Sequence, residues 1–251
     1  MTRIIMHGCN GSMGQVISEL ARQDENVHIV AGIDLSGNKN NYYPVFNSVA
    51  ECDIEADVII DFSSAAAADK LLKDAVKKKI PIVLCTTGLS SEQIESIQES
   101  SKKIAILKSA NMSLGVNTLL KLLQTATKVL NGADFDIEIV EKHHNRKIDA
   151  PSGTALALAD AINEVLNNEY AYQYDRSALK EKRNKKEIGI SAVRGGTIVG
   201  EHEVIFAGVD EVIEFKHTAY SKAIFAKGAI SAAKFLGGKE PGMYDMSHVI
   251  G

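Results

Sequence analysis

The first 113 residues alternate short apolar runs with amphipathic stretches, and this alternation limits the possible folds more than any other feature. Strand-like runs are expected at about residues 3–7, 27–33, 57–62, 80–85 and 104–107, with helices at about 12–23, 65–79 and 91–101. Near-continuous apolar strands separated by helices are typical of a parallel sheet covered on both faces. Because crossover connections are right-handed, we predict an α/β domain with a Rossmann-like, doubly wound parallel sheet. The segment between Asp34 and Asp57 is polar, apart from residues 43–46, so one β-α-β unit is expected to be abbreviated there.

The pattern changes after Ser113, where longer helices and alternating strands follow. Helices are expected at residues 114–130 and 153–166, and extended runs at 135–140, 188–193, 204–207 and 212–215, the last two joined by a hairpin turn at 208–211. This arrangement predicts a second, α+β domain at residues 114–223 with a mixed or antiparallel sheet. A helix at residues 221–236 is expected to return to the first domain, so that residues 1–113 are completed by about 224–251.

The composition excludes several classes of protein. With 28 basic and 32 acidic side chains, the 251-residue chain has a formal charge of −4, whereas nucleic-acid binding rests on an excess of Lys and Arg. No apolar run approaches the roughly 18 residues of a membrane helix, and the stretch before the first glycine is too short for a secretory signal. Three cysteines at unrelated spacings cannot all pair, which suits a reducing compartment. We expect a cytoplasmic protein that binds neither nucleic acid nor membrane.

A glycine-rich turn follows the first predicted strand and opens the first predicted helix. Residues 8–14, Gly-Cys-Asn-Gly-Ser-Met-Gly, have G-x-x-G-x-x-G spacing rather than the commoner G-x-G-x-x-G. Glycines let backbone N–H groups approach a pyrophosphate, and the amino terminus of a helix favours an anion. Asp34 ends the second strand 20 residues after Gly14, where a carboxylate reaches the ribose hydroxyls of a dinucleotide. A tight turn with no ligand is the alternative.

The residue after Asp34 bears on the choice of nicotinamide cofactor. A carboxylate repels a 2′-phosphate, and Leu35 stands where a basic residue would neutralise one. We therefore expect NADH to be preferred, with NADPH possible. Two more strand ends, Cys85–Gly88 and Ala110–Ser113, carry small hydroxyl and amide residues that suit a nicotinamide carboxamide and ribose, although ordinary turn chemistry explains them equally well.

The most informative segment is 141–154, Glu-Lys-His-His-Asn-Arg-Lys-Ile-Asp-Ala-Pro-Ser-Gly-Thr. Ser152 is placed to cap a helix, and the N–H groups of Gly153 and Thr154 would then form a carboxylate site. The two histidines have side chains suited to proton transfer near neutral pH, and the adjacent Arg and Lys add positive charge for an acidic substrate.

Other readings of this segment are a metal site and a merely polar loop. Adjacent histidines on a strand point to opposite faces, and no third ligand has suitable spacing, so no metal is expected.

The basic run at residues 180–186 is expected to be a solvated loop, with a mobile lid over an anion as the alternative. His7, His28 and His248 are expected to be structural, while the roles of His202 and His217 stay open.

Segment 141–155 resembles the signature of the dihydrodipicolinate reductase family. The resemblance extends to the glycine turn, to residues 86–88, 110–113, 200–203 and 217–221, and so to essentially the whole chain. It implies a nucleotide-binding domain and a substrate domain whose sheet mediates a homotetramer. The implied reaction, in lysine and diaminopimelate biosynthesis, is NAD(P)H-dependent reduction of 4-hydroxy-tetrahydrodipicolinate, a small heterocyclic dicarboxylate, to tetrahydrodipicolinate with release of water.

The same resemblance implies roles for individual residues. His143 matches the family's proton donor and acceptor, and Lys147 matches its second donor. Substrate contacts are implied for His144, Gly153 and Thr154. Cofactor contacts are implied for Gly8, Cys9, Asn10, Gly11, Ser12, Met13, Asp34, Cys85, Thr86, Thr87, Ala110, Asn111, Met112 and Ser113.

The chain departs from the family pattern in two places. Members that use both cofactors commonly carry an Arg where Leu35 stands, and the region between Asp34 and Asp57 is shorter than in many members.

Two other functions compete with the reductase function that the resemblance implies. A related two-domain dehydrogenase would act on a small amino or oxo acid, and a silent dinucleotide-binding sensor would need neither His143 nor Lys147.

Overall fold

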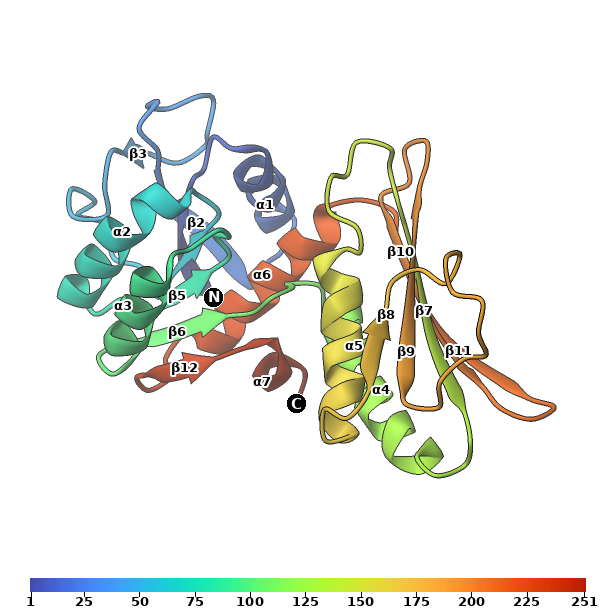
Figure 1. The fold of residues 1–251 in the computed structure, drawn as a ribbon. Helices are drawn as coiled ribbons and strands as arrows, with labels where there is room; N and C mark the ends of the chain where they lie inside the picture. The colour runs from blue at the N-terminus through green and yellow to red at the C-terminus, as the bar shows by residue number, and fades with distance from the viewer. The chain divides into compact units, whose positions relative to one another are not determined.

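The computed structural model describes all residues, 1–251. The chain forms two compact units, one made of residues 1–114 and 223–251 and the other of residues 115–222 (Figure 1). None of the helices is long and apolar enough to cross a membrane.

The first unit is built around a parallel sheet. Its elements are β1 (Thr2–His7), α1 (Ser12–Arg22), β2 (Val27–Ile33), β3 (Val45–Phe46), β4 (Val58–Asp61), α2 (Ala65–Lys78), β5 (Ile82–Leu84), α3 (Ser91–Ser101), β6 (Ala105–Lys108), α6 (Ala223–Leu236), β12 (Gly242–Tyr244) and α7 (Met246–Ile250). The seven strands run in the order β12-β6-β5-β4-β1-β2-β3, and every neighbouring pair is parallel. The strand order reverses between β1 and β4, which is where open α/β sheets bind ligands, at the carboxyl ends of the strands.

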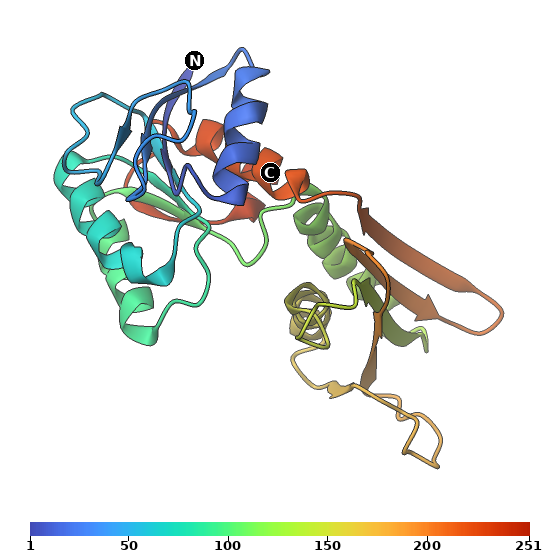
Figure 2. The same ribbon diagram turned by 90° about the horizontal axis from the view of Figure 1, so that it is seen from above.

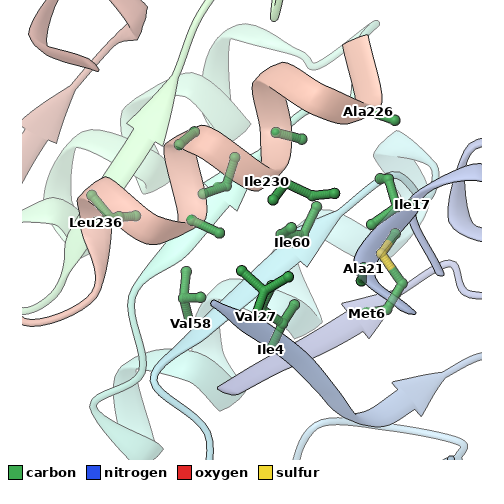
Figure 3. Packing of buried hydrophobic residues seen from close by; sticks show 14 of the residues in the cluster. Ile4, Met6, Ile17, Ala21, Val27, Val58, Ile60, Ala226, Ile230 and Leu236 are labelled. Carbon is green, nitrogen blue, oxygen red and sulfur yellow. The ribbon is translucent and has the colours of Figure 1, made fainter. Parts of the chain in front are cut away.

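Helices cover both faces of this sheet. Helices α1 and α6 lie on one face and α2 and α3 on the other (Figure 2). On the first face, Ile17 of α1 and Ile230 of α6 pack on Ile4 and Ile60 of the central strands, as Figure 3 shows. The near-continuous apolar runs of the sequence are therefore strands buried on both sides, and the predicted doubly wound sheet is confirmed.

The second unit combines two helices with a mixed sheet. Its elements are α4 (Leu114–Leu130), β7 (Asp136–His143), α5 (Gly153–Val165), β8 (Ala171–Gln173), β9 (Glu187–Arg194), β10 (Gly200–Ala207) and β11 (Val212–Ala219). The five strands run in the order β11-β10-β7-β9-β8. Strand β10 is antiparallel to both β7 and β11, whereas β9 is parallel to β7 and β8. The predicted α+β unit with a mixed sheet is thus confirmed.

One face of this second sheet is covered by α4 and α5. Alternate residues of β7 point to that face, beginning with Ile137 and Ile139, which pack against Leu123 of α4 and Leu158 of α5. The same alternation turns Glu141 and His143 toward the helix-covered side. No helix of this unit lies on the opposite face (Figure 1).

Several element boundaries differ from those that the sequence predicts. The sequence predicts a strand ending at residue 140, whereas β7 continues to His143, because its last inward residues are polar and interrupt the apolar alternation. Strands β8 and β12 and helix α7 were not predicted, since three to five residues are too few to show a period. Strand β3 has only two residues, and no helix links it to β2 or β4, so the abbreviated unit is confirmed.

Candidate active site

The glycine turn lies between β1 and α1. Gly8 has a φ of +80°, and a Cβ there would lie 2.6 Å from the carbonyl oxygen of Phe62 at the end of β4. Gly14 allows α1 to pack on the turn, because a Cβ at this position would lie 2.7 Å from the carbonyl oxygen of Cys9. The N-cap residue of α1 is Gly11, which offers no side-chain oxygen to the first N–H groups of the helix. The turn therefore leaves an unobstructed helix amino terminus at the switch point of the sheet.

Asp34 lies directly after β2 and beside this turn. Its carboxylate accepts hydrogen bonds from the Asn10 N–H at 3.1 Å and from the Ser36 hydroxyl at 2.6 Å. Burial would raise the pKa of Asp34, but the hydrogen bonds from Ser36 and Asn10 outweigh burial and lower the pKa. The side chain of Asn10 also donates to the carbonyl oxygen of Gly37 at 2.7 Å, which ties the turn to the loop after β2. An anionic carboxylate is thus held where a ribose is expected.

A pocket of about 310 Å³ opens at the same place. It is lined by Asp34 and Leu35 after β2, by His7 at the end of β1, and by residues of α2, including Ala67 and Lys70. The contribution of α2 could not be found from the sequence, since nothing in an alanine-rich helix marks the residues that line a pocket.

A buried carboxylate joins the ends of three parallel strands. Asp61, at the end of β4, is fully buried and lies 2.6 Å from Nδ1 of His7 at the end of β1. Thr86, after β5, donates its hydroxyl proton to the other Asp61 oxygen at 2.6 Å, and the Ser63 hydroxyl donates to the first oxygen. With its proton committed to Asp61, the Thr86 hydroxyl can only accept a further hydrogen bond, such as one from an amide N–H₂. His7 therefore has a structural partner in Asp61. The sequence analysis missed Asp61 because an Asp at the end of a strand cannot be told from an ordinary turn residue.

The remaining predicted cofactor residues differ in what they can offer a ligand. The side chain of Cys9 faces Gly32 and Tyr43 in the core, so only its backbone reaches the turn. Burial raises the pKa of the Cys9 thiol to about 11 and also raises that of Cys85. Thr87 is exposed, whereas Met112 is buried. The segment at 110–113 packs against Gly228 of α6, where any Cβ would collide with the carbonyl oxygen of Met112.

In the second unit, a buried carboxylate organises the segment that follows β7. Glu141 is fully buried, and one of its oxygens lies 2.6 Å from Nδ1 of His143. The guanidinium of Arg194, at the end of β9, donates to both Glu141 oxygens at 2.8 and 2.6 Å. The other ring nitrogen of His143 faces the backbone of Gly200, where an added Cβ would lie 3.0 Å from Nε2. Burial would raise the pKa of Glu141, but hydrogen bonds from Arg194, His143 and the Ser152 N–H outweigh it and lower the pKa.

The predicted start of α5 is confirmed. Ser152 is the N-cap, and its hydroxyl accepts a hydrogen bond from the Ala155 N–H at 3.2 Å. Gly153 and Thr154 are the first two residues of the helix, and Gly153 is exposed with open space around it. The Ser152 N–H donates to Glu141 at 2.9 Å, so the histidine and the helix start share one carboxylate.

His202 on β10 lies beside His143. The two ring centroids are 5.1 Å apart, and Nε2 of His202 lies 2.9 Å from the Ser152 hydroxyl. Burial lowers the pKa of His202 to about 4, with positive charge on His143 and Lys147 acting in the same direction. His217 pairs with His202 in the register of β10 and β11, and burial lowers its pKa as well. His202 therefore stays neutral near pH 7.

The two remaining residues of the predicted substrate site lie in the loop after β7. Lys147 forms an ion pair with Asp149, with 2.9 Å between Nζ and Oδ1. His144 is half-buried, and its buried Nδ1 has no hydrogen-bond partner within the protein. Within the second unit, the structure gathers His143, His202, Arg194 and the start of α5 around Glu141. Glu141 and Arg194 were missed, although strand alternation continued past residue 140 would have placed Glu141 inward.

The basic run at 180–186 lies elsewhere in the second unit. A cavity of about 510 Å³ is lined by Arg183, Lys185 and Lys186 together with the carboxyl-terminal ends of α4 and α5. Each of these cations already has a carboxylate partner, in Asp136, Asp134 and Glu169 respectively. These three cations are therefore neutralised by neighbouring carboxylates in this part of the second unit.

A doubly wound parallel sheet has a glycine turn and an ionised carboxylate at its switch point, and it is followed in the chain by a unit that carries a histidine–lysine segment. Together these features are those of an NAD(P)H-dependent oxidoreductase. Two family models match the chain: "Dihydrodipicolinate reductase, N-terminus" over residues 2–112 and "Dihydrodipicolinate reductase, C-terminus" over residues 115–250. This chain belongs to the family of 4-hydroxy-tetrahydrodipicolinate reductases, the NAD(P)H-dependent oxidoreductases of lysine biosynthesis.

Comparisons with individual relatives and with solved structures lead to the same family. The chain is 54% identical to the 4-hydroxy-tetrahydrodipicolinate reductase of Caldanaerobacter subterraneus subsp. tengcongensis, over 100% of this chain and 98% of the relative. It is 50% identical to that of Clostridium tetani, over 98% and 96%. Among solved structures, the dipicolinate-bound dihydrodipicolinate reductase from Paenisporosarcina sp. TG-14 superposes with a TM-score of 0.83 at 24% identity, covering 100% of this chain and 99% of that one. At this identity the superposition shows a shared fold.

Proposed function

We propose that this chain reduces 4-hydroxy-tetrahydrodipicolinate with a hydride from NADH, and that His143 supplies the proton. The first unit is the dinucleotide-binding domain and the second binds the substrate and mediates oligomerisation. The observation that carries this proposal is the network around Glu141. This network fixes the imidazole of His143 beside the start of α5, and the cationic Lys147 follows His143 by four residues in the chain. A sensor would need none of these groups. The identity of about half the residues to 4-hydroxy-tetrahydrodipicolinate reductases over the full length supports this substrate over a small amino or oxo acid.

The atoms of the proposed reaction balance as follows. Loss of water from the substrate gives a conjugated cyclic imine. When bound, the reduced nicotinamide would supply a hydride, and the imine that gains its two electrons at a ring carbon would become an electron-rich enamine. Protonated His143 donates the proton on Nε2 to the neighbouring carbon, keeps the proton on Nδ1, and later regains a proton from solvent. The products are tetrahydrodipicolinate, water and oxidised nicotinamide. General acid catalysis of this kind contributes roughly 10²–10⁴-fold to a rate.

The two carboxylates of the substrate need separate partners. The start of α5, with Gly153 and Thr154, would bind one of them, since a helix amino terminus favours an anion. His144 would add a donor, and Lys147 would balance charge on the nitrogen side of the ring as the second proton donor. Dipicolinate, the ligand in the Paenisporosarcina structure, is a planar pyridine dicarboxylate and so a suitable probe of this site.

For the cofactor, the pocket beside Asp34 is the proposed site of the adenine ribose. The ionised carboxylate would accept hydrogen bonds from the 2′- and 3′-hydroxyls and repel a 2′-phosphate. Residues 8–13 would bind the pyrophosphate through backbone N–H groups. Residues 85–87 and 110–113 would bind the nicotinamide half, with Thr86 accepting from the carboxamide. NADH is therefore the proposed preference, and NADPH a poorer substrate.

Two further expectations rest on the family resemblance and stay proposals. A homotetramer would use the face of the second sheet that carries no helix, where Val140 and Ile205 are half-buried and Val193 is 44% exposed. The enzyme would work in the cytoplasm on a small substrate, without nucleic acid or membrane.

The direct test is a coupled assay with the aldehyde–pyruvate condensation product as substrate, following NADH oxidation. Wild type should turn over, and Glu164→Gln, on the exposed side of α5, should do the same. A wild-type enzyme that binds NADH but oxidises none in the presence of this substrate would contradict the proposal.

A further inference from the structure

Glu141 has an unusual position for a charged residue. Its carboxylate is fully buried, yet it accepts hydrogen bonds from an imidazole, a guanidinium and a backbone N–H. A buried carboxylate without partners would be strongly destabilising, whereas one that is ion-paired and fully hydrogen-bonded is held in a single orientation. The partners of Glu141 come from three separate places: the end of its own strand, the end of β9 and the start of α5.

Arg194 makes this arrangement rigid. Its guanidinium forms two parallel bonds with Glu141, the geometry in which Arg binds a carboxylate most specifically. The same guanidinium donates at 2.5 Å to the carbonyl oxygen of Asp149, in the loop that links β7 to α5. Arg194 thus fixes both the carboxylate and the loop that carries Lys147.

We propose that Glu141, held by Arg194, is a positioning residue that orients His143 for proton transfer and fixes the start of α5 against it. This inference rests on the proposed function, since it assumes that His143 is the proton donor. Glu141 itself does not touch the substrate in this proposal. It acts through His143 on one side and through the Ser152 N–H on the other.

The first effect follows from the two nitrogens of the imidazole. An ionised carboxylate 2.6 Å from Nδ1 accepts the proton of that nitrogen, so Nδ1 remains protonated in every state of the ring. Nε2, beside Gly200, is then the nitrogen that exchanges a proton with a ligand. A Gln at position 141 could present its amide N–H₂ to Nδ1 instead, which would favour the opposite tautomer.

The second effect follows from the backbone hydrogen bond. The Ser152 N–H points to Glu141, and Ser152 caps the helix whose first residues are Gly153 and Thr154. One carboxylate therefore sets the position of the proton donor and that of the carboxylate site together. Positioning of this kind matters because a displacement of about 1 Å can cost roughly 10²-fold in rate.

Other charged and titratable groups face His143 and define its surroundings. Arg194 reaches the network from β9, His202 and His217 lie on β10 and β11, and Lys147 lies in the following loop. Burial lowers the pKa of both His202 and His217, so the cations that face His143 near neutral pH are Arg194 and Lys147. Glu141 is the fully buried anion among these groups, and replacing it by Gln leaves Arg194 without that counter-charge.

The test is a double-mutant cycle on kcat with Glu141→Gln and His143→Gln. Glu141→Gln should lower kcat on the order of a hundredfold, comparable to the loss of an orienting partner of a functional histidine. In the His143→Gln background, the same change should lower kcat by at most about tenfold, because the route through His143 is already gone and only the route through the Ser152 N–H remains. Equal effects in both backgrounds would mean that Glu141 is merely structural and would overturn the proposal.

A substrate-free measurement separates this inference from the proposed function. ¹⁵N NMR of the histidine side chains should show Nδ1 of His143 protonated in wild type and a changed ring signal in Glu141→Gln. If His143→Gln leaves kcat unchanged, the proposed role of His143 as proton donor fails, while the NMR result still decides whether Glu141 orients the ring. An unchanged His143 signal would overturn the positioning role whatever the kinetics.

Two further variants guard against loss of folding. Glu141→Asp keeps the charge but withdraws it by one carbon, so kcat should lie between those of wild type and Glu141→Gln. Glu164→Gln, on the exposed side of α5, is the matched control and should leave kcat and the NMR signals unchanged. If Glu141→Gln does not fold, a Glu141→Asp variant with wild-type kcat and a wild-type His143 signal would overturn the proposal.

Discussion

Lys147 forms an ion pair with Asp149, with 2.9 Å between Nζ and Oδ1. The hydrogen bond from Lys147 lowers the pKa of Asp149, which is ionised near neutral pH. The Asp149 side chain is 57% exposed, so the pair is weak, but it occupies the ammonium that the substrate is proposed to use.

Asp149→Asn should therefore strengthen the binding of a dicarboxylate. We expect the Kd of dipicolinate, measured by calorimetry, to fall about threefold, which corresponds to the small energy of an exposed pair. Lys147→Ala should raise the same Kd and also lower kcat, since Lys147 is assigned both to substrate binding and to proton donation. Weaker dipicolinate binding by Asp149→Asn would show that Asp149 orients Lys147 for the ligand and does not compete for it.

The proton-transfer role of His143 predicts a loss in kcat. His143→Gln should lower kcat by roughly 10²–10⁴-fold with little change in KM, because the lost interaction belongs to the transition state. Steady-state kinetics with NADH at neutral pH is the measurement. Values of kcat and KM that both stay near wild type would remove His143 from the mechanism.

Gly200 leaves room for the exchanging nitrogen of His143. A Cβ at this position would lie 3.0 Å from Nε2, so Gly200→Ala should displace the ring and lower kcat by about tenfold or more. Gly195→Ala is the control, since nothing lies within 4 Å of its Cβ position. The thermal unfolding midpoint should stay close to wild type in both variants. Normal kcat in Gly200→Ala would mean that Nε2 does not face the reacting group.

How much of the fold and of the site could be predicted from the sequence depends on whether a feature has a signal within a short stretch of the chain. The parallel sheet follows from runs such as Val58–Asp61, and the start of α5 follows from Ser152, because both signals are local. The sequence does not show that Asp61 and Glu141 are buried carboxylates with several hydrogen-bond partners. Those partners lie on or after other strands, and only the pairing of the strands brings them together. Arg194 was missed for the same reason, being 53 residues from Glu141 in the chain.

Cofactor preference is expected to depend on the residue after Asp34. Leu35 is 85% exposed, so Leu35→Arg should cost little in folding while offering a guanidinium to a 2′-phosphate. We expect kcat/KM for NADPH to rise roughly tenfold, as one charged hydrogen bond allows. Parallel kinetics with both cofactors checks this, and Leu35→Gln is a neutral control of similar length. A wild-type enzyme that already prefers NADPH would contradict the assignment of Asp34.

The burial of His202 predicts how stability changes with pH. Its folded pKa of about 4 lies below the unfolded value of about 6.5, so between these pH values the unfolded chain binds a proton that the folded protein does not. His202 therefore contributes stability that is fully present above pH 6.5 and is lost as pH falls toward 4, on the order of 3 kcal/mol. Urea unfolding at pH 7 and at pH 4.5 should show a smaller drop in the free energy of unfolding for His202→Gln than for wild type. His28→Gln, on the exposed side of β2, is the control and should keep the wild-type drop. An equal drop in all three proteins would show that His202 is protonated in the folded state.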